Sequence, residues 1–104
     1  MKPYIELYCN FFGIAYGEFL GCEICGTRVT EIHHIHRRGA GGTKLPDEIC
    51  NLMALCREHH IKYGDKKQFK EYLYYTHLKH LLSIKPDYQI KEKYLKYLEY
   101  NPNL

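Results

Sequence analysis

The stretch Glu31-Ile32-His33-His34-Ile35-His36 decides the fold of this chain, because it places three of the seven histidines within four positions. Each buried imidazole must find a hydrogen-bond partner, so a plain core strand gains nothing from such a cluster. Neutral imidazole is also the commonest metal ligand in proteins. The region from Val29 to His34 is rich in β-branched residues and predicts a strand. Neighbouring residues on a regular strand point to opposite faces, so His33 and His34 share a site only if the strand bulges or ends there.

Two short cysteine-centred pieces flank the histidine stretch. They are Cys22-Glu23-Ile24-Cys25, with a glycine on either side, and Cys56-Arg57-Glu58-His59. Two residues between ligands let both side chains point at one ion, and the flanking glycines permit a tight turn. The four ligands form a closed Cys₃His set typical of structural zinc, namely Cys22, Cys25, Cys56 and His59. A reduced, metal-free pair of cysteine knuckles is the alternative.

Length and composition limit the class of protein. With 104 residues a single domain over residues 1–104 is the default, and a domain of this size often needs a staple. We expect a cytoplasmic protein without a membrane partner, because no apolar run spans a bilayer and a signal peptide's order of residues is missing. In that compartment, closely spaced cysteines and an odd count of five favour metal over disulfides. The net charge of +3 is compatible with a polyanionic partner.

Helical and strand patterns surround the two half-sites. Apolar residues recur at helical spacing from Pro3 to Phe12, and Gly13 suits the end of that helix. The apolar run from Asn51 to Leu55 predicts a second strand. A short helix from Arg57 to Tyr63, halted by Gly64, should follow it.

The last forty residues are expected to be helical. Asp65-Lys66-Lys67-Gln68 has the composition of a capping box that opens a helix, and Pro86 precedes a final one. His77 and His80 on these helices are expected to be surface or packing residues. The unassigned Cys9 and Cys50 are expected to be small buried apolar residues.

Together these motifs resemble the HNH endonuclease family, which has a ββα-metal fold. The resemblance covers about residues 21 to 64. It rests on Cys22-x-x-Cys25, on Glu31-Ile32-His33-His34-Ile35 and on Asn51-Leu52-x-x-Leu55-Cys56-x-x-His59-His60. It implies an α+β fold: a ββα-metal core with a structural zinc site, flanked by an N-terminal helix and by a helical extension over residues 65–104. The small size also resembles phage-encoded members, which would act in the host cytoplasm.

The resemblance implies a role for each matched residue. His33 falls where the family has a metal ligand, and His34 falls on its general-base histidine. Asn51 matches the asparagine that orients the loop bearing this base. His60 matches a second metal ligand, and it lies about 100° around a helix from the zinc ligand His59.

The chain departs from the family pattern at two positions. His59 replaces the commoner cysteine in the zinc set, which is a chemically acceptable change. Gly64 stands where the family often has a further histidine; His36 or water could fill that coordination position. Because of His36, the alignment of this histidine stretch with the family motif also remains open by a residue or two. For Arg37 and Arg38, a contact with DNA phosphate and a solvated turn both remain open.

These features lead to a divalent-metal-dependent DNA endonuclease as the first hypothesis. An imidazole can take a proton from water, and a divalent ion with open positions can neutralise a phosphate and stabilise a leaving oxygen. Two imidazoles alone hold Mg²⁺ weakly and would bind Mn²⁺, Ni²⁺ or Zn²⁺ better. The family resemblance implies nicking or cutting of duplex DNA to 5′-phosphate and 3′-hydroxyl ends.

Two other functions stay open at this point. The first is a non-catalytic zinc-stapled DNA-binding module, and the second is a zinc domain that binds only proteins. The choice of DNA target could come from DNA structure or from a partner protein.

Overall fold

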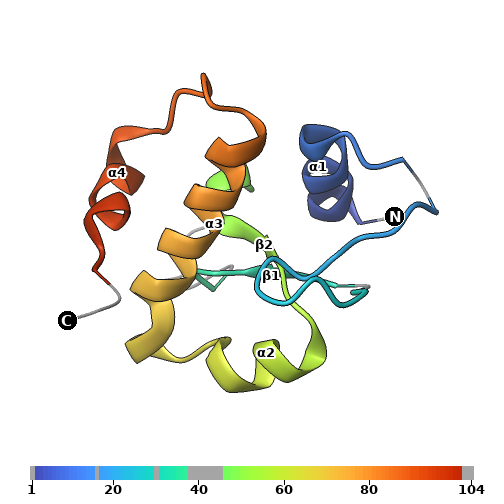
Figure 1. The fold of residues 1–104 in the computed structure, drawn as a ribbon, viewed down its shortest axis with the longest axis horizontal. Helices are drawn as coiled ribbons and strands as arrows, with labels where there is room; N and C mark the ends of the chain where they lie inside the picture. Colours follow the sequence, from blue (N-terminus) through green and yellow to red (C-terminus); the bar gives the residue numbers. More distant parts are fainter. Residues whose placement is uncertain (1, 16, 30, 38–45, 102–104) are drawn as a thin grey trace.

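The sheet is a short antiparallel ladder at the centre of the chain. The structure is a computed structural model and describes residues 2–15, 17–29, 31–37 and 46–101, so the predicted phosphate contact Arg38 lies outside it. Strands β1 (Ile32–His34) and β2 (Leu52–Ala54) pair so that His33 lies opposite Met53. In Figure 1, α1 lies above this ladder and α2 below it, while α3 runs past it from above to below.

The part of the chain that the structure describes also contains four α-helices and three short 3₁₀ helices. The helices are α1 (Pro3–Phe12), α2 (Arg57–Tyr63), α3 (Lys70–Ile84) and α4 (Glu92–Leu95). The turns are η2 (Ile49–Asn51), η3 (Lys67–Phe69) and η4 (Lys96–Glu99). The predicted α+β class is confirmed.

Both predicted strands are shorter than the sequence pattern. The first begins at Ile32 and not at Val29, because the Val29 amide donates to the carbonyl of Leu20, 2.8 Å away, and so pairs with the cysteine knuckle. The second is preceded by η2, which includes Asn51. Strand β1 therefore ends at His34, and an end of the strand is one of the two ways in which His33 and His34 were expected to share a site; a bulge was the other.

Helix α1 has the predicted bounds and turns the face predicted from its helical spacing toward the core. Gly13 closes it with φ 69°, a left-handed conformation that glycine adopts without steric cost. Its buried residues are Tyr4 and Tyr8, and the partly buried Ile5 and Phe12 pack against the same core. Tyr8 can be buried because its hydroxyl donates to Glu23 Oε2 at 2.6 Å.

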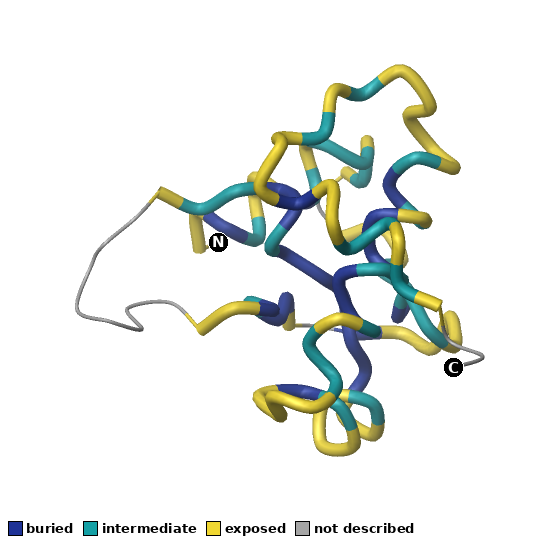
Figure 2. Tube along the Cα trace, turned by 90° about the vertical axis from the view of Figure 1, so that its left-hand side faces the viewer, coloured by how far each residue is buried: buried dark blue, intermediate teal, exposed yellow. Residues whose placement is uncertain are grey.

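The core is built around β2, whose three residues are all fully buried. Leucines of α3, namely Leu73, Leu78 and Leu81, belong to the same buried cluster, and Figure 2 shows the buried trace through the middle of the molecule. The predicted final helix is present as α4 and η4. Its Tyr97 ring stacks on Tyr74 of α3 at 4.2 Å between centroids.

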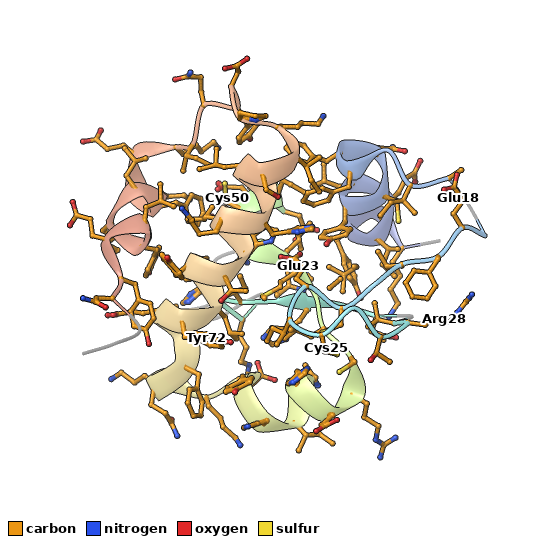
Figure 3. All side chains as sticks on the ribbon, in the orientation of Figure 1. Glu18, Glu23, Cys25, Arg28, Cys50 and Tyr72 are labelled. Carbon is orange, nitrogen blue, oxygen red and sulfur yellow. The ribbon has the colours of Figure 1, made fainter. Side chains whose placement is uncertain are left out.

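A buried polar network ties the first cysteine knuckle to α1 and α3. Glu23, between the two knuckle cysteines, has its carboxylate 2.8 Å from Nδ1 of His77 and also accepts from Tyr8. Nε2 of His77 lies 2.7 Å from the carbonyl oxygen of Ile49. Figure 3 shows Glu23 in the interior, while Arg28 lies at the edge. His77 is therefore a packing residue, and every buried polar atom of this network has a partner.

The capping box predicted at Asp65 was wrong. The α-helix begins only at Lys70, after η3, and neither helical start has a side-chain cap. Asp65 has φ 56°, in the left-handed region, and lies beyond the end of α2. Its carboxylate is used in a cluster with histidines instead of capping a helix.

Candidate metal centre and adjoining pocket

Four ligands from two distant segments meet at the start of α2. Sγ of Cys25 lies 3.7 Å from Sγ of Cys56, and Nδ1 of His59 lies 3.3 Å from Cys56 Sγ and 3.7 Å from Cys22 Sγ. Tetrahedral ligands about 2.3 Å from a zinc ion are separated by about 3.7 Å, so these distances suit that ion. The Cys₃His cluster can hold a metal such as zinc.

The exposed member of this cluster has the chemistry of a ligand. The Thr27 hydroxyl lies 3.2 Å from Sγ of Cys25, and hydrogen bonds with Thr27 lower the pKa of this thiol to about 6. Cys25 is therefore mainly thiolate at neutral pH, which is the form that binds metals. Gly26 has φ 79° and lets the chain turn back directly after it.

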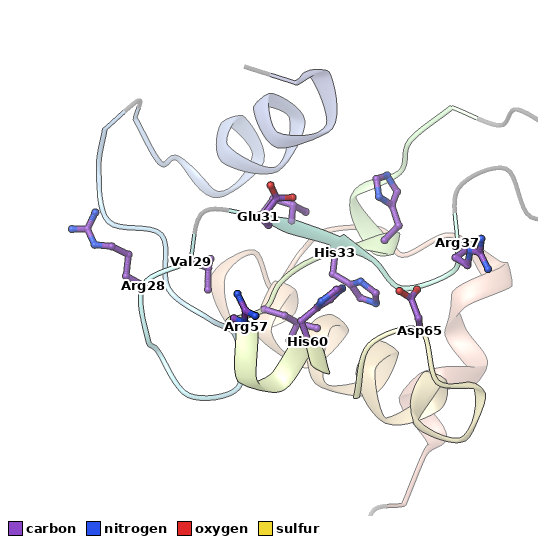
Figure 4. Close-up of a pocket in the computed structure, with 11 residues that line it drawn as sticks. Arg28, Val29, Glu31, His33, Arg37, Arg57, His60 and Asp65 are labelled. Carbon is purple, nitrogen blue, oxygen red and sulfur yellow. The ribbon is translucent and has the colours of Figure 1, made fainter. Parts of the chain in front are cut away.

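A second cluster lies on the other side of α2. It consists of His33 from β1, His60 from α2 and Asp65, whose ligand atoms lie within 4.8 Å of one another. The rings of His33 and His60 meet edge to face, with centroids 4.8 Å apart. In Figure 4 both imidazoles and the Asp65 carboxylate point toward one another.

His33 is prepared to donate a lone pair. Burial, and then the nearby charge of His60, lowers the pKa of His33 to about 4, so its ring is neutral at pH 7. Its Nε2 atom is buried and has no hydrogen-bond partner. A buried polar atom without a partner costs about 1–3 kcal/mol. A cation between His33, His60 and Asp65 would remove that cost.

The turn after α2 explains why the third group is Asp65. A Cβ atom on Gly64 would lie 2.5 Å from the carbonyl oxygen of His60 and 2.9 Å from its ring. No side chain fits there, so the chain provides no ligand from position 64. The next residue carries the carboxylate, and aspartate tolerates the left-handed backbone that turns it toward His60.

His34 has a carboxylate partner. Its Nε2 lies 2.9 Å from Oδ1 of Asp47, and Tyr4 of α1 packs edge-on against the ring, with centroids 4.7 Å apart. Because an ionised carboxylate only accepts, Nε2 carries the hydrogen in the neutral ring, and Nδ1 keeps its lone pair. His34 is thus held in the tautomer that can accept a proton at Nδ1.

Asn51 fastens the segment that follows His34. Its Oδ1 accepts from the His36 amide at 2.8 Å, and its Nδ2 donates to the His36 carbonyl at 3.1 Å. The Tyr74 hydroxyl donates to the same Oδ1 at 2.7 Å. The side chain of His36 lies outside the His33 cluster, and Lys70 Nζ is 2.8 Å from its Nδ1.

One pocket of about 730 Å³ brings the predicted histidines together. His33, His34 and His60 all line it, as does Asp65. Arg37, one of the two predicted phosphate contacts, lines it too, together with two arginines that were not predicted, Arg28 and Arg57. Figure 4 shows Arg28 and Arg37 toward opposite ends of the site.

Sequence reasoning missed both carboxylates of the site. For Asp65 a signal existed, since an acidic residue directly follows the position where a third ligand was lacking. No local pattern marks Asp47, which reaches His34 across 13 residues. Arg28 and Arg57 lie next to predicted motifs, but charge alone does not distinguish them from solvated side chains.

Comparison of the chain with protein-family models, curated proteins and solved structures gave no match. Among the described residues, no helix combines the length and apolar character that crossing a bilayer requires.

Proposed function

We propose that this chain is an HNH-type endonuclease that hydrolyses DNA phosphodiester bonds with a divalent metal ion and is stapled by a structural zinc ion. One observation carries the proposal: three imidazoles, two of them in a ligand cluster with a carboxylate, line a single pocket that also holds three arginines. This combination provides metal ligands, a proton acceptor and phosphate-binding groups at one place.

The two clusters suit different ions. The Cys₃His set offers four soft or borderline ligands and no free position, which suits structural zinc. His33, His60 and Asp65 would hold the catalytic ion, with further coordination positions left for substrate and water. The Asp65 oxygen makes this set better suited to Mg²⁺ or Mn²⁺ than imidazoles alone, while Ni²⁺ or Zn²⁺ would also bind.

Proton transfer is assigned to His34. When bound, the divalent ion supplies charge neutralisation at the phosphate and stabilises the leaving oxygen. Nδ1 of His34 accepts the proton of the attacking water, while Asp47 keeps Nε2–H in place and Asn51 holds the chain just beyond. Arg28, Arg37 and Arg57 are available to contact phosphates on either side. By family resemblance, the products carry 5′-phosphate and 3′-hydroxyl ends.

The second candidate is a zinc-stapled DNA-binding module without activity. The arginines of the pocket favour it, because phosphate contacts alone give DNA affinity. In such a module, however, two features would have no role: the buried, unpartnered nitrogen of His33 and the Asp47–His34 pair.

A plasmid assay separates the two candidates. Supercoiled DNA is incubated with the protein and Mg²⁺ or Mn²⁺, and then with EDTA. We expect metal-dependent nicking that falls about 10²–10⁴-fold in His34→Ala, the range for loss of a general base. The matched control is His80→Ala on α3, which should nick like wild type. DNA binding without nicking under every metal tried would support the module, and full activity in His34→Ala would contradict the assigned base.

A further inference from the structure

A second, smaller pocket adjoins the proposed catalytic one. It has a volume of about 300 Å³ and is lined by His36, Lys66, Lys67 and Lys70. Arg37 and Asp65 line both pockets, so the two are direct neighbours. The second pocket lies between the segment after β1 and the start of α3.

The two pockets concentrate the positive charge of the chain. Together they are lined by six cationic side chains, Arg28, Arg37, Arg57, Lys66, Lys67 and Lys70, against two carboxylates, Glu31 and Asp65. The whole chain has a net charge of only +3. The rest of the molecule is therefore close to neutral or slightly acidic, and an anionic partner would be drawn to this face.

The lysines of the second pocket are not neutralised by acidic partners. No ion pair between described residues involves Lys66, Lys67 or Lys70. Lys70 Nζ instead meets a ring nitrogen of His36 at 2.8 Å, and Lys66 Nζ donates to a backbone carbonyl at 3.0 Å. By contrast, Lys91 and Lys93 both contact the Glu48 carboxylate. The ammonium groups of the second pocket thus remain available to an anion.

We propose that the second pocket is a subsite for a neighbouring phosphate of the same DNA strand whose scissile phosphate lies in the first pocket. This inference rests on the proposed function. Lysine binds phosphate as a point charge and needs no fixed geometry, which suits a flexible strand entering the site. Asp65 lies where the two pockets meet, and its carboxylate would repel a phosphate there. A cation bound to Asp65 would neutralise this charge and so favour a strand that runs through both pockets.

The subsite makes the enzyme selective for polynucleotides. A small diester such as bis(p-nitrophenyl) phosphate has one phosphate and fills only the first pocket. DNA gains additional binding from Lys67 and Lys70. Loss of these lysines should therefore reduce DNA binding and nicking and leave hydrolysis of the small diester unchanged.

The test compares two double variants of equal charge. Lys67→Ala/Lys70→Ala removes the subsite, and Lys79→Ala/Lys85→Ala is the control. Lys79 follows Lys70 by nine residues on α3, which places it about 180° around the helix. The measurements are the melting temperature, the affinity for a labelled DNA duplex in EDTA at several salt concentrations, nicking, and bis(p-nitrophenyl) phosphate hydrolysis.

We expect the subsite variant alone to lose about tenfold in DNA affinity, with a log–log salt slope smaller by about 1 to 2. Equal losses in both double variants, or wild-type affinity in the subsite variant, would overturn the inference. So would an equal loss of small-diester hydrolysis, because that would place the lysines in the metal site. If wild type nicks no DNA under any metal, the proposed function fails, while the affinity comparison in EDTA still decides whether the lysines bind phosphate.

Discussion

The two ligand clusters on α2 differ in their number of ligands and in the space around them. The first has four ligands and joins two segments of chain, with His59 as its only imidazole. The second has three ligands and lies at the wall of a large pocket, with His60 as its member from α2. These two histidines are adjacent in sequence, so one helical turn supplies both clusters.

Two sets of this kind would let a small domain keep its stability and its chemistry at separate places. A full tetrahedral set leaves an ion no position for substrate, so its binding energy becomes folding energy. An incomplete set beside open space leaves positions for phosphate and water. Because both sets share α2, an ion bound in the first cluster would hold the helix and so also fix the position of His60 in the second.

Loss of one zinc ligand is expected to have the largest effect. Structural zinc contributes about 10–16 kcal/mol in small zinc-binding peptides, which is as large as the whole stability of a typical domain. Cys22→Ser should therefore abolish the cooperative fold. His60→Ala should keep one zinc per chain and the same circular dichroism, while losing nicking. Equal loss of structure in both variants would show that the two clusters are not independent.

Removing the acidic ligand should give the next largest effect. Asp65→Asn replaces a charged oxygen ligand by a neutral one, and we expect at least about a tenfold rise in the Mn²⁺ concentration for half-maximal nicking, about 1.4 kcal/mol. Melting temperature and zinc content should not change. Asp87→Asn, in an exposed turn, is the matched control. An unchanged Mn²⁺ requirement in Asp65→Asn would remove Asp65 from the second cluster.

A pH dependence of stability is expected as well. The pKa of His33 is about 4 in the folded chain, against an ordinary value of 6.5. Between these values the unfolded chain binds more protons, so this contribution to stability is complete above pH 6.5 and is lost as the pH falls toward 4. The free energy of unfolding is measured in urea at pH 7 and pH 5 for the zinc-loaded protein. Between these pH values it should fall by up to about 2 kcal/mol more in wild type than in His33→Asn. An equal fall in the free energy of unfolding in wild type and in His33→Asn would mean that His33 is not desolvated in the folded chain.

The elements and ligand pairs that depend on near neighbours could be predicted from the amino-acid sequence alone. The bounds of α1 and α2 followed from Pro3, Gly13 and Gly64, which act within one turn of the chain. The two-residue gaps in Cys22–Cys25 and Cys56–His59 were sufficient to identify the first cluster, because each gap lies on one turn or one start of a helix. The His-rich strand likewise pointed to a second site.

The distant groups that join these local pairs could not be predicted, because they depend on how the chain packs. Asp47 reaches His34, and Glu23 reaches His77 across 54 residues, through the packing of α1 and α3 around the buried β2. At Asp65 a local capping pattern was overridden, because the turn at Gly64 directs its carboxylate toward His33 and His60. Local rules describe contacts within about four residues. Groups far apart in sequence meet only where burial of the core brings their segments together, and that depends on the whole fold.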